Sequence, residues 1–257
     1  METEMVKCEV ADFIAVVTMD NPPVNAQNMQ FHQDMMLTFD TLSDMDDVRV
    51  VVLTGAGNNF SAGADIKGRA GKTRGPGEAW QHNRTARECF HSIVECRKPV
   101  IGAVNGVALG AGLAVAASCD ILFAAENTLI GLPEINVGLL GGGRHAMRLF
   151  GHSTVRRMMF TGYRIPGPEL YRLGVVEACV TAEDLMESAM EMARDIAAKS
   201  PIAMGLAKEA LNAIEEMSLR DGYRYEQNKT TELSKYDDSR EAMLAFAEKR
   251  VPVFKGR

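Results

Sequence analysis

The chain has 257 residues, which is long enough for one large domain with a buried core, or for a main domain with a small appendage. Its composition, with 46% hydrophobic and 24% charged residues, is typical of a globular protein. The formal net charge of −6, without any basic patch, argues against a nucleic acid or an anionic membrane as a partner.

Five cysteines are scattered along the chain without CxxC spacing. This odd, unpaired pattern predicts reduced thiols in the cytoplasm and argues against a zinc site or a disulfide framework. The first residues lack the form of a secretory signal, and no apolar run reaches the ~18 residues of a membrane span. We therefore expect a cytoplasmic protein without a metal and without membrane contact. The cysteines are Cys8, Cys89, Cys96, Cys119 and Cys179.

The N-terminal part of the chain alternates between strand-like and helix-like segments. A β-hairpin is predicted over residues 6–19, with its turn at Ala11 and Asp12. Three almost wholly apolar runs are typical of strands buried on both faces, and two further segments predict crossover helices. This order favours an α/β fold. The three runs are 48–54, 100–104 and 121–124, and the two helices are 27–43 and 78–96.

From about Pro166 onward the sequence becomes mostly helical. Pro201 fits the first position of a helix, with Ser200 as its N-cap. We therefore expect two units, a core over residues 1–195 and a C-terminal helical subdomain over residues 196–257. The predicted helices are 166–173, 182–199, 201–217, 219–235 and 239–249.

Two segments rich in glycine and alanine are candidates for ligand binding, 61–67 (SAGADIK) and 105–134, which begins NGVALGAG and ends in Pro-Glu. Gly110 and Gly112 remove side-chain bulk where a strand gives way to a helix, so backbone N–H groups at the helix start are open to an oxyanion. One N–H from each segment would form an oxyanion hole, in which the loss of one donor typically costs ~3 kcal/mol. Tight helix packing explains such glycines equally well.

Four motifs in this order and at these spacings resemble the enoyl-CoA hydratase/isomerase family, the crotonases. The resemblance implies a crotonase-like α/β spiral of ββα turns with a C-terminal helical trimerisation region, and trimers that often pair into hexamers. It also implies an acyl-CoA substrate, whose coenzyme A is the thioester portion, and no permanently bound cofactor. The C-terminus, AFAEKRVPVFKGR, resembles that of carnitinyl-CoA dehydratases. The motifs are FSAGADIK (60–67), AVNGVALGAG (103–112), CDILFA (119–124) and LPEINVGLL (132–140).

By matching of motifs, the resemblance implies that the Ala64 and Ala111 N–H groups hold the oxygen of a thioester enolate, and that Glu134 moves the proton. Family hydratases carry another glutamate in a GGGxE pattern, where this chain has Ala114. One glutamate suffices to move a proton between two carbons, so we slightly prefer isomerisation over hydration or dehydration. Carbon–carbon lysis, hydrolysis and decarboxylation are further alternatives. The Pro133–Glu134 pair also fits the start of a helix or turn without a catalytic role.

Three further residues are candidates for the site. Arg144 and His145 stand where relatives have small residues. Arg144 could pair with a substrate carboxylate or lower the pKa of Glu134, and His145 could replace the missing acid–base group. Alternatively, both side chains lie in solvent or at a subunit interface. Tyr225 aligns with a tyrosine of hydroxycinnamoyl-CoA hydratase-lyases, or it packs on a helix face.

Seven positions match residues that bind coenzyme A in relatives. Cations suit a phosphate, and an apolar or aromatic surface suits adenine. We expect Asp65 to fix its loop rather than contact substrate, and Phe246 and Lys249 to reach across to a neighbouring subunit. The positions are Val24, Ala26, Ala62, Asp65, Lys67, Phe246 and Lys249.

Two functions of other classes compete with an enzyme. A chain without the first glutamate could be a non-catalytic acyl-CoA binder. Some relatives bind RNA through a lysine-rich helix, but the corresponding region here, 27–47, is acidic. His82 and His91, two histidines of the predicted helix 78–96, are expected at the surface and outside the site.

Overall fold

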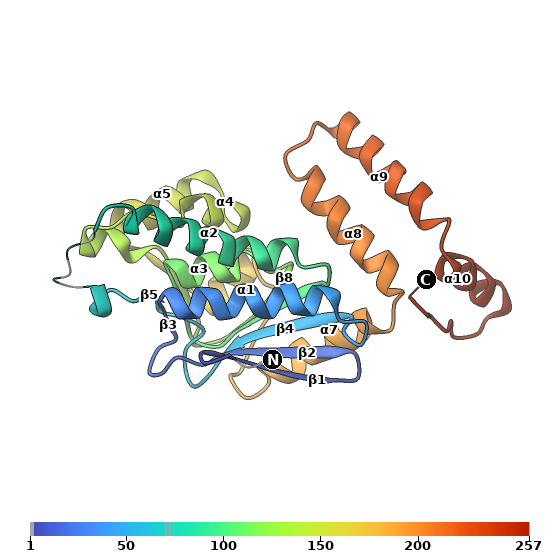
Figure 1. Cartoon of the computed structure of the whole chain (residues 1–257), viewed down its shortest axis with the longest axis horizontal. Coiled ribbons are helices and arrows are strands. Elements are labelled where there is room, and N and C mark those ends of the chain that lie inside the picture. Colours follow the sequence, from blue (N-terminus) through green and yellow to red (C-terminus); the bar gives the residue numbers. More distant parts are fainter. Residues whose placement is uncertain (1–2, 70, 72, 74, 257) are drawn as a thin grey trace.

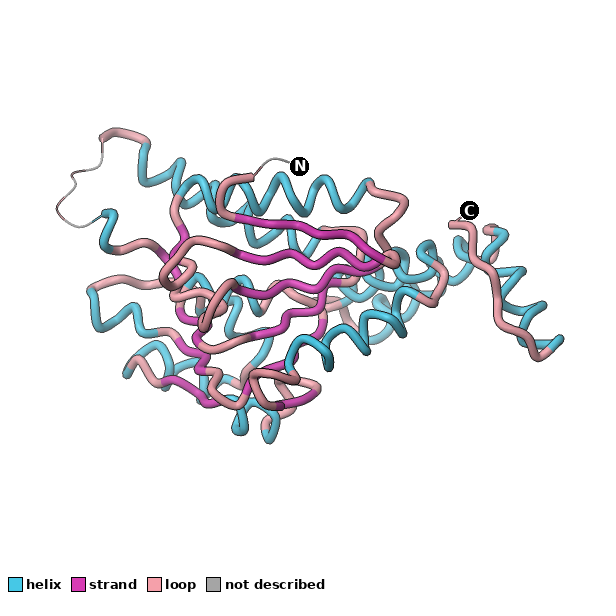
Figure 2. Tube along the Cα trace, turned by 90° about the horizontal axis from the view of Figure 1, so that it is seen from below, coloured by secondary structure: helices cyan, strands magenta, loops and turns pink. Residues whose placement is uncertain are grey.

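The computed structural model describes residues 3–69, 71, 73 and 75–256. Six strands form the central sheet, in the order β1-β2-β4-β6-β8-β11. Figure 2 shows long strands of the molecule lying side by side. β1 and β2 pair antiparallel, and the other pairs in this sheet are parallel, which confirms the α/β prediction. The strands are β1 (Val6–Ala11), β2 (Ile14–Met19), β4 (Val50–Gly55), β6 (Val100–Val104), β8 (Ile121–Ala125) and β11 (Ala178–Val180).

Helices cover both faces of the central sheet (Figure 1). Val51 and Leu53 of β4 join the core cluster that includes the apolar side of α1, whereas Val50 and Val52 pack in the cluster with α7. The whole of β4 is buried, so the prediction of a strand with two buried faces is confirmed. The covering helices are α1 (Met29–Asp44) and α2 (Glu78–Glu95) on one face and α7 (Leu185–Ala197) on the other.

Short strands and helices connect the layers and carry the glycine-rich segments. A second sheet has the order β10-β9-β7, and β3 pairs with β5. With two or three residues each, these strands are too short to leave a periodic pattern in the sequence. The short elements are β3 (Ala26–Gln27), β5 (Gly63–Ala64), η1 (Lys67–Arg69), β7 (Val107–Leu109), α3 (Ala111–Ala116), β9 (Leu129–Gly131), η2 (Pro133–Val137), α4 (Gly143–Leu149), α5 (His152–Thr161), β10 (Arg164–Pro166) and α6 (Gly167–Arg172).

Two of the element boundaries that differ from the sequence prediction have a clear local cause. The hairpin turn lies at Asp12 and Phe13, one residue later than predicted, because these two residues adopt positive φ angles (51° and 66°), as a two-residue hairpin turn of type I′ does. The first helix begins after β3, two residues later than predicted. Its N-cap is Asn28, whose side chain accepts a hydrogen bond from the Phe31 N–H (2.9 Å).

The last three helices extend away from the core as an arm (Figure 1). Ser200 caps the first of them by accepting a hydrogen bond from the Ala203 N–H (3.3 Å), with Pro201 as the first helical residue, as predicted. In the described part of the chain, no helix is both long and apolar enough to cross a membrane. The helices of the arm are α8 (Pro201–Ile214), α9 (Leu219–Leu233) and α10 (Asp237–Glu248).

A buried lysine of α8 forms hydrogen bonds and an ion pair with the core. Lys208 is only 5% exposed. Its ammonium group donates to the carbonyls of Ile93 and Lys98, both at 3.1 Å, and lies 2.8 Å from a carboxylate oxygen of Asp120. These three contacts satisfy all three donors of the ammonium group, so the charge is compensated inside the protein.

Candidate active site

The two glycine-rich segments lie against each other. The Ser61 N–H donates to the Val107 carbonyl (2.9 Å), and the Leu109 N–H donates back to the Ser61 carbonyl (3.0 Å). Gly63 has a φ of +87°, and a methyl group on it would collide with the Leu109 carbonyl oxygen and lie 3.1 Å from the Ala111 nitrogen. Only glycine fits this close approach of two backbones. The meeting of the two loops, which the sequence alone could not show, is therefore a feature of the fold.

Ala64 of β5 and Ala111 of α3 lie in the two segments that meet at this junction. The Asp65 N–H donates to the Gln27 carbonyl of β3 (2.9 Å). Because successive N–H groups of a strand point to opposite sides, that of Ala64 points away from β3. Ala111 is the first residue of α3, so its N–H has no partner within the helix. Each segment therefore has one backbone N–H that is directed away from the hydrogen bonds of its own strand or helix.

The Glu134 carboxylate lies against the same turn. Gly110, which precedes α3, has a φ of +57°, and a methyl group on it would lie 2.5 Å from Glu134 Oε1. Among the described residues, the buried Oε2 atom has no hydrogen-bond partner. Burial raises the pKa of Glu134, and a backbone N–H opposes this shift only in part. A carboxylate with a raised pKa binds a proton more readily than an exposed one, which suits it to proton transfer.

The position of the missing glutamate lies inside α3. Ala114 is 1% exposed, and its N–H donates to the Gly110 carbonyl (3.1 Å). The Ser118 hydroxyl donates to the Ala114 carbonyl (2.8 Å). The small residue is thus part of a tightly packed helix, and it offers no acid–base group to the site.

The two basic candidates of α4 have different environments. Arg144 is exposed and forms an ion pair with Glu216, in the loop after α8. His145 is half-buried, and its ring packs edge-on against Phe90 of α2 (5.1 Å between centroids). Burial lowers the pKa of His145 to about 4, with His91 and two arginines adding to the effect. The neutral form of the His145 imidazole is therefore favoured at neutral pH.

Tyr225 lies on the arm, on the side of α9 that faces α8. Its hydroxyl donates to Glu209 (3.3 Å), and the Lys229 ammonium lies 5.8 Å from its ring centroid. Figure 1 shows α9 standing away from α3 and β5. Within one chain the structure does not bring Tyr225 to Glu134.

Five of the seven positions matched to coenzyme A lie together. The Ala62 N–H donates to the Val24 carbonyl (2.9 Å), and Ala26 pairs with Gly63. The Asp65 carboxylate accepts a hydrogen bond from the Gly68 N–H (2.8 Å). This bond fixes the chain at the start of η1, where Lys67 lies.

The other two positions lie on α10, at the far end of the arm (Figure 1). Phe246 is 88% exposed, and Lys249 is the C-cap residue of α10. In a single chain they do not approach the loop that contains Ala64.

Polar residues that hold the site's loops were not singled out from the sequence. The buried Asn25 side chain donates to the carbonyls of Ala56 (3.0 Å) and Asn59 (2.7 Å). Gln27, fully buried, donates to the Ser61 hydroxyl (3.1 Å). Their only signal is a pair of amide side chains directly after the Pro-Pro break, which is also typical of any turn.

One surface prediction needs correction: His91 is exposed, but His82 is half-buried with its ring 5.8 Å from that of His32.

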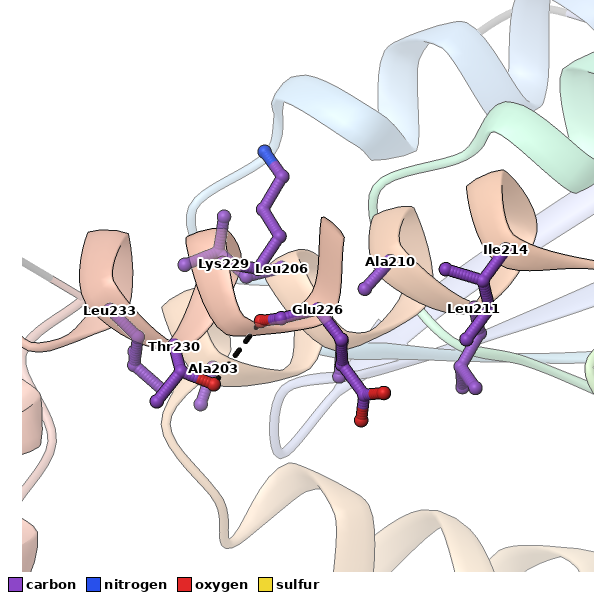
Figure 3. Close-up of a pocket in the computed structure, with 10 residues that line it drawn as sticks. Ala203, Leu206, Ala210, Leu211, Ile214, Glu226, Lys229, Thr230 and Leu233 are labelled. Carbon is purple, nitrogen blue, oxygen red and sulfur yellow. Dashed lines mark hydrogen bonds between the residues drawn. The ribbon is translucent and has the colours of Figure 1, made fainter. Parts of the chain in front are cut away.

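A separate apolar groove of about 300 Å³ lies between α8 and α9 (Figure 3). Leu206, Leu211 and Ile214 of α8 and Leu233 of α9 line it. None of the residues matched to catalysis lies in this groove, so it is a different surface from the site at Gly110.

A sequence profile of the family described as Enoyl-CoA hydratase/isomerase matches residues 9–257. The short-chain-enoyl-CoA hydratase of Clostridium acetobutylicum is 34% identical over 263 residues and covers 100% of both chains. The carnitinyl-CoA dehydratase of Salmonella typhi is 35% identical over 254 residues, with 95% of each chain covered. A Mycobacterium tuberculosis protein named (7aS)-7a-methyl-1,5-dioxo-2,3,5,6,7,7a-hexahydro-1H-indene-carboxyl-CoA hydrolase is 36% identical over 236 residues, which cover 92% of this chain and 95% of that one.

Solved structures of enoyl-CoA hydratases are similar to this chain over nearly its whole length. The enoyl-CoA hydratase from Bacillus anthracis superposes with a TM-score of 0.93 at 31% identity, over 99% of this chain and 100% of that one. The chain therefore belongs to the enoyl-CoA hydratase/isomerase family, the crotonases, and has their α/β fold with C-terminal helices. It is an enzyme that acts on acyl-CoA, and its similarity to carnitinyl-CoA dehydratases, first noted at the C-terminus, extends over most of the chain.

Proposed function

We propose that this enzyme moves a proton along an acyl-CoA thioester, with Glu134 as its one proton carrier. The thioester oxygen would accept hydrogen bonds from the Ala64 and Ala111 N–H groups. The observation that carries the proposal is the position of Gly110, which directly precedes Ala111 at the start of α3 and lies against the Glu134 carboxylate.

Isomerisation is the reaction that needs the fewest groups. Glu134 removes a proton from C2 of a 3-enoyl thioester, and the electron pair moves onto the thioester oxygen, where the two N–H groups stabilise the dienolate. The protonated Glu134 then delivers the proton to C4, which gives the 2-enoyl thioester. Hydration would require a second group to position water, and Ala114 cannot serve.

Hydration or dehydration is the second candidate, because the Clostridium and Salmonella relatives are named for these reactions. Hydrolysis is a further alternative, since the name of the Mycobacterium relative is that of a hydrolase. In each of these reactions the two N–H groups would stabilise a negatively charged oxygen, and Glu134 would transfer a proton.

The test offers 2-hexenoyl-CoA and 3-hexenoyl-CoA to the wild-type protein and to Glu134→Gln. We expect conversion of the 3-enoyl substrate to exceed hydration of the 2-enoyl substrate, and to fall by about 10³-fold in the variant. Efficient hydration that is unaffected by Glu134→Gln would contradict the mechanism. Retained acyl-CoA binding without turnover on a broad thioester panel would favour a non-catalytic binder.

We further propose that the arm, residues 196–257 in the division expected from the sequence, assembles copies of the chain into a trimer or a pair of trimers. The groove between α8 and α9 is apolar and open, and Leu211 in it is 64% exposed. Phe246 and Lys249 at the end of the arm would then reach the coenzyme A site of a neighbour.

The proposed proton transfer needs no permanently bound cofactor. A cytoplasmic location stays a prediction from the cysteine pattern.

A further inference from the structure

His145 lies in the first turn of α4, whose N-terminus is packed against the proposed site, but it has no part in the proposed proton transfer. A methyl group on Gly142, the residue before α4, would lie 2.6 Å from the Leu132 side chain and 3.6 Å from the Gly110 carbonyl oxygen. Glu134 packs against this same Gly110. Since His145 is in the first turn of α4, it lies only three residues from the wall of the site.

The imidazole belongs to a row of rings that crosses three helices. His145 of α4 contacts Phe90 of α2 edge-on, with 5.1 Å between centroids and an interplanar angle of 74°. Phe90 lies 6.3 Å from His32 of α1, whose ring is 5.8 Å from that of His82. His145 and Phe90 are both only partly buried, so this end of the row keeps surface open to a ligand.

Burial, together with the charged groups around it, favours the neutral form of the His145 ring. Arg144 and Arg148 on α4 and His91 on α2 add to the effect of burial, which lowers the pKa of His145 to about 4. A neutral imidazole has one N–H donor and one acceptor nitrogen. It can therefore form a hydrogen bond with a carbonyl or a hydroxyl oxygen without bringing a charge into the site.

The two arginines of α4 already have protein partners. Arg144 pairs with Glu216, and Arg148 pairs with Glu215 (3.1 Å) and donates to the Ala117 carbonyl (2.8 Å). Both glutamates follow α8, so the ion pairs also connect the loop between α8 and α9 to α4. An acyl group that reached α4 would thus meet a neutral histidine and a phenyl ring rather than an unpaired cation.

We propose that His145 is a specificity-determining residue, which donates a hydrogen bond to an oxygen atom of the acyl chain beyond the reacting carbons while Phe90 packs against the same chain. The substrates would be oxygenated acyl-CoA thioesters, with a keto or hydroxyl group, rather than plain alkyl ones. This inference rests on the proposed function, because the acyl chain points toward α4 only if the thioester oxygen lies at Ala64 and Ala111.

Binding of saturated thioesters tests the inference without any turnover. Isothermal titration calorimetry would compare hexanoyl-CoA with 4-oxohexanoyl-CoA, 5-oxohexanoyl-CoA and 6-hydroxyhexanoyl-CoA. We expect at least one oxygenated thioester to bind the wild-type protein about tenfold more tightly than hexanoyl-CoA, as one additional hydrogen bond in a half-buried site allows. His145→Leu should abolish this difference, whereas His145→Gln, which keeps a donor, should retain part of it.

His152→Leu is the matched control, because His152 is the exposed first residue of the neighbouring helix α5. It should bind every thioester as the wild-type protein does. Equal affinity of the wild-type protein for all four thioesters would overturn the inference, and so would an equal loss for all four in His145→Leu. Failure of the proposed function would appear separately, as an absence of turnover on 3-hexenoyl-CoA and 2-hexenoyl-CoA.

Discussion

Gly110 is the position where the proposed oxyanion hole and the proton carrier meet. Its φ of +57° is costly for a residue with a side chain, and a methyl group there would lie 2.5 Å from Glu134 Oε1. Since that oxygen is at the far end of a flexible side chain, Glu134 would swing aside instead of blocking folding. The residue is thus required more by the site than by the core.

Gly110→Ala should therefore lower kcat by at least tenfold and the free energy of unfolding by only about 1–2 kcal/mol. Steady-state kinetics and urea unfolding would measure the two effects. The matched control is Gly141→Ala, because a methyl group on Gly141 meets nothing within 4 Å. A variant at position 110 with wild-type kcat would show that the Glu134 position does not matter for the reaction.

Glu134 sets the expected pH dependence. As a base it acts in its ionised form, and burial raises its pKa above the ordinary value of 4.5. The rate of isomerisation should rise with pH, and the midpoint of this rise should lie above 4.5. A midpoint below 4.5 would mean that a cation, such as Arg144, lowers the pKa instead, which was one of the alternatives open from the sequence. The profile of kcat/KM against pH for 3-hexenoyl-CoA measures this midpoint.

At the scale of single residues, the sequence led to Glu134, Ala64 and Ala111 only through the resemblance of whole motifs. Their residue types alone carry little information, because an alanine acts here through its backbone. Asn25 and Gln27 were not identified, although their side chains fix the loop that carries Ala64. Hydrogen bonds between a side chain and distant carbonyls leave no spacing pattern in the sequence.

At the scale of elements, the sequence predicted the long helices and the fully buried strands, because burial on one or two faces imposes a periodicity. The run 100–104 matches β6 residue for residue. β3 and β5 escaped prediction because two residues have no period, yet their pairing directs the Ala64 N–H away from β3. The elements that form the site are therefore the least visible ones in the sequence.

The attachment of α8 depends on the buried ammonium group of Lys208. Lys208→Met should lower the free energy of unfolding by about 2 kcal/mol, because the Ile93 and Lys98 carbonyls lose their donor and the Asp120 carboxylate keeps, among the described residues, only the Val100 N–H. Urea unfolding measures the change. Lys199→Met, at an exposed position just before α8, is the control and should change stability little. Equal effects of the two substitutions would argue against the proposal that Lys208 holds α8 on the core.

At the scale of the whole molecule, the arm is the part of the fold that one chain leaves open. We expect the wild-type protein to sediment with about three times the 28.0 kDa of one chain, or a multiple of that mass. Leu211→Glu puts a charge into the groove between α8 and α9 and should lower the mass toward that of a single chain. A wild-type protein that stays monomeric at micromolar concentration would contradict the proposed assembly.

The central claim is that one carboxylate takes the proton from C2 and returns it to C4. The most direct measurement follows deuterium from 3-hexenoyl-CoA labelled at C2, by NMR of the 2-hexenoyl-CoA formed in ordinary water. The account predicts that part of the label appears at C4, and that Glu134→Gln forms this product at least about 10³-fold more slowly. The account would be contradicted if the label were never found at C4 and the variant formed product at the wild-type rate.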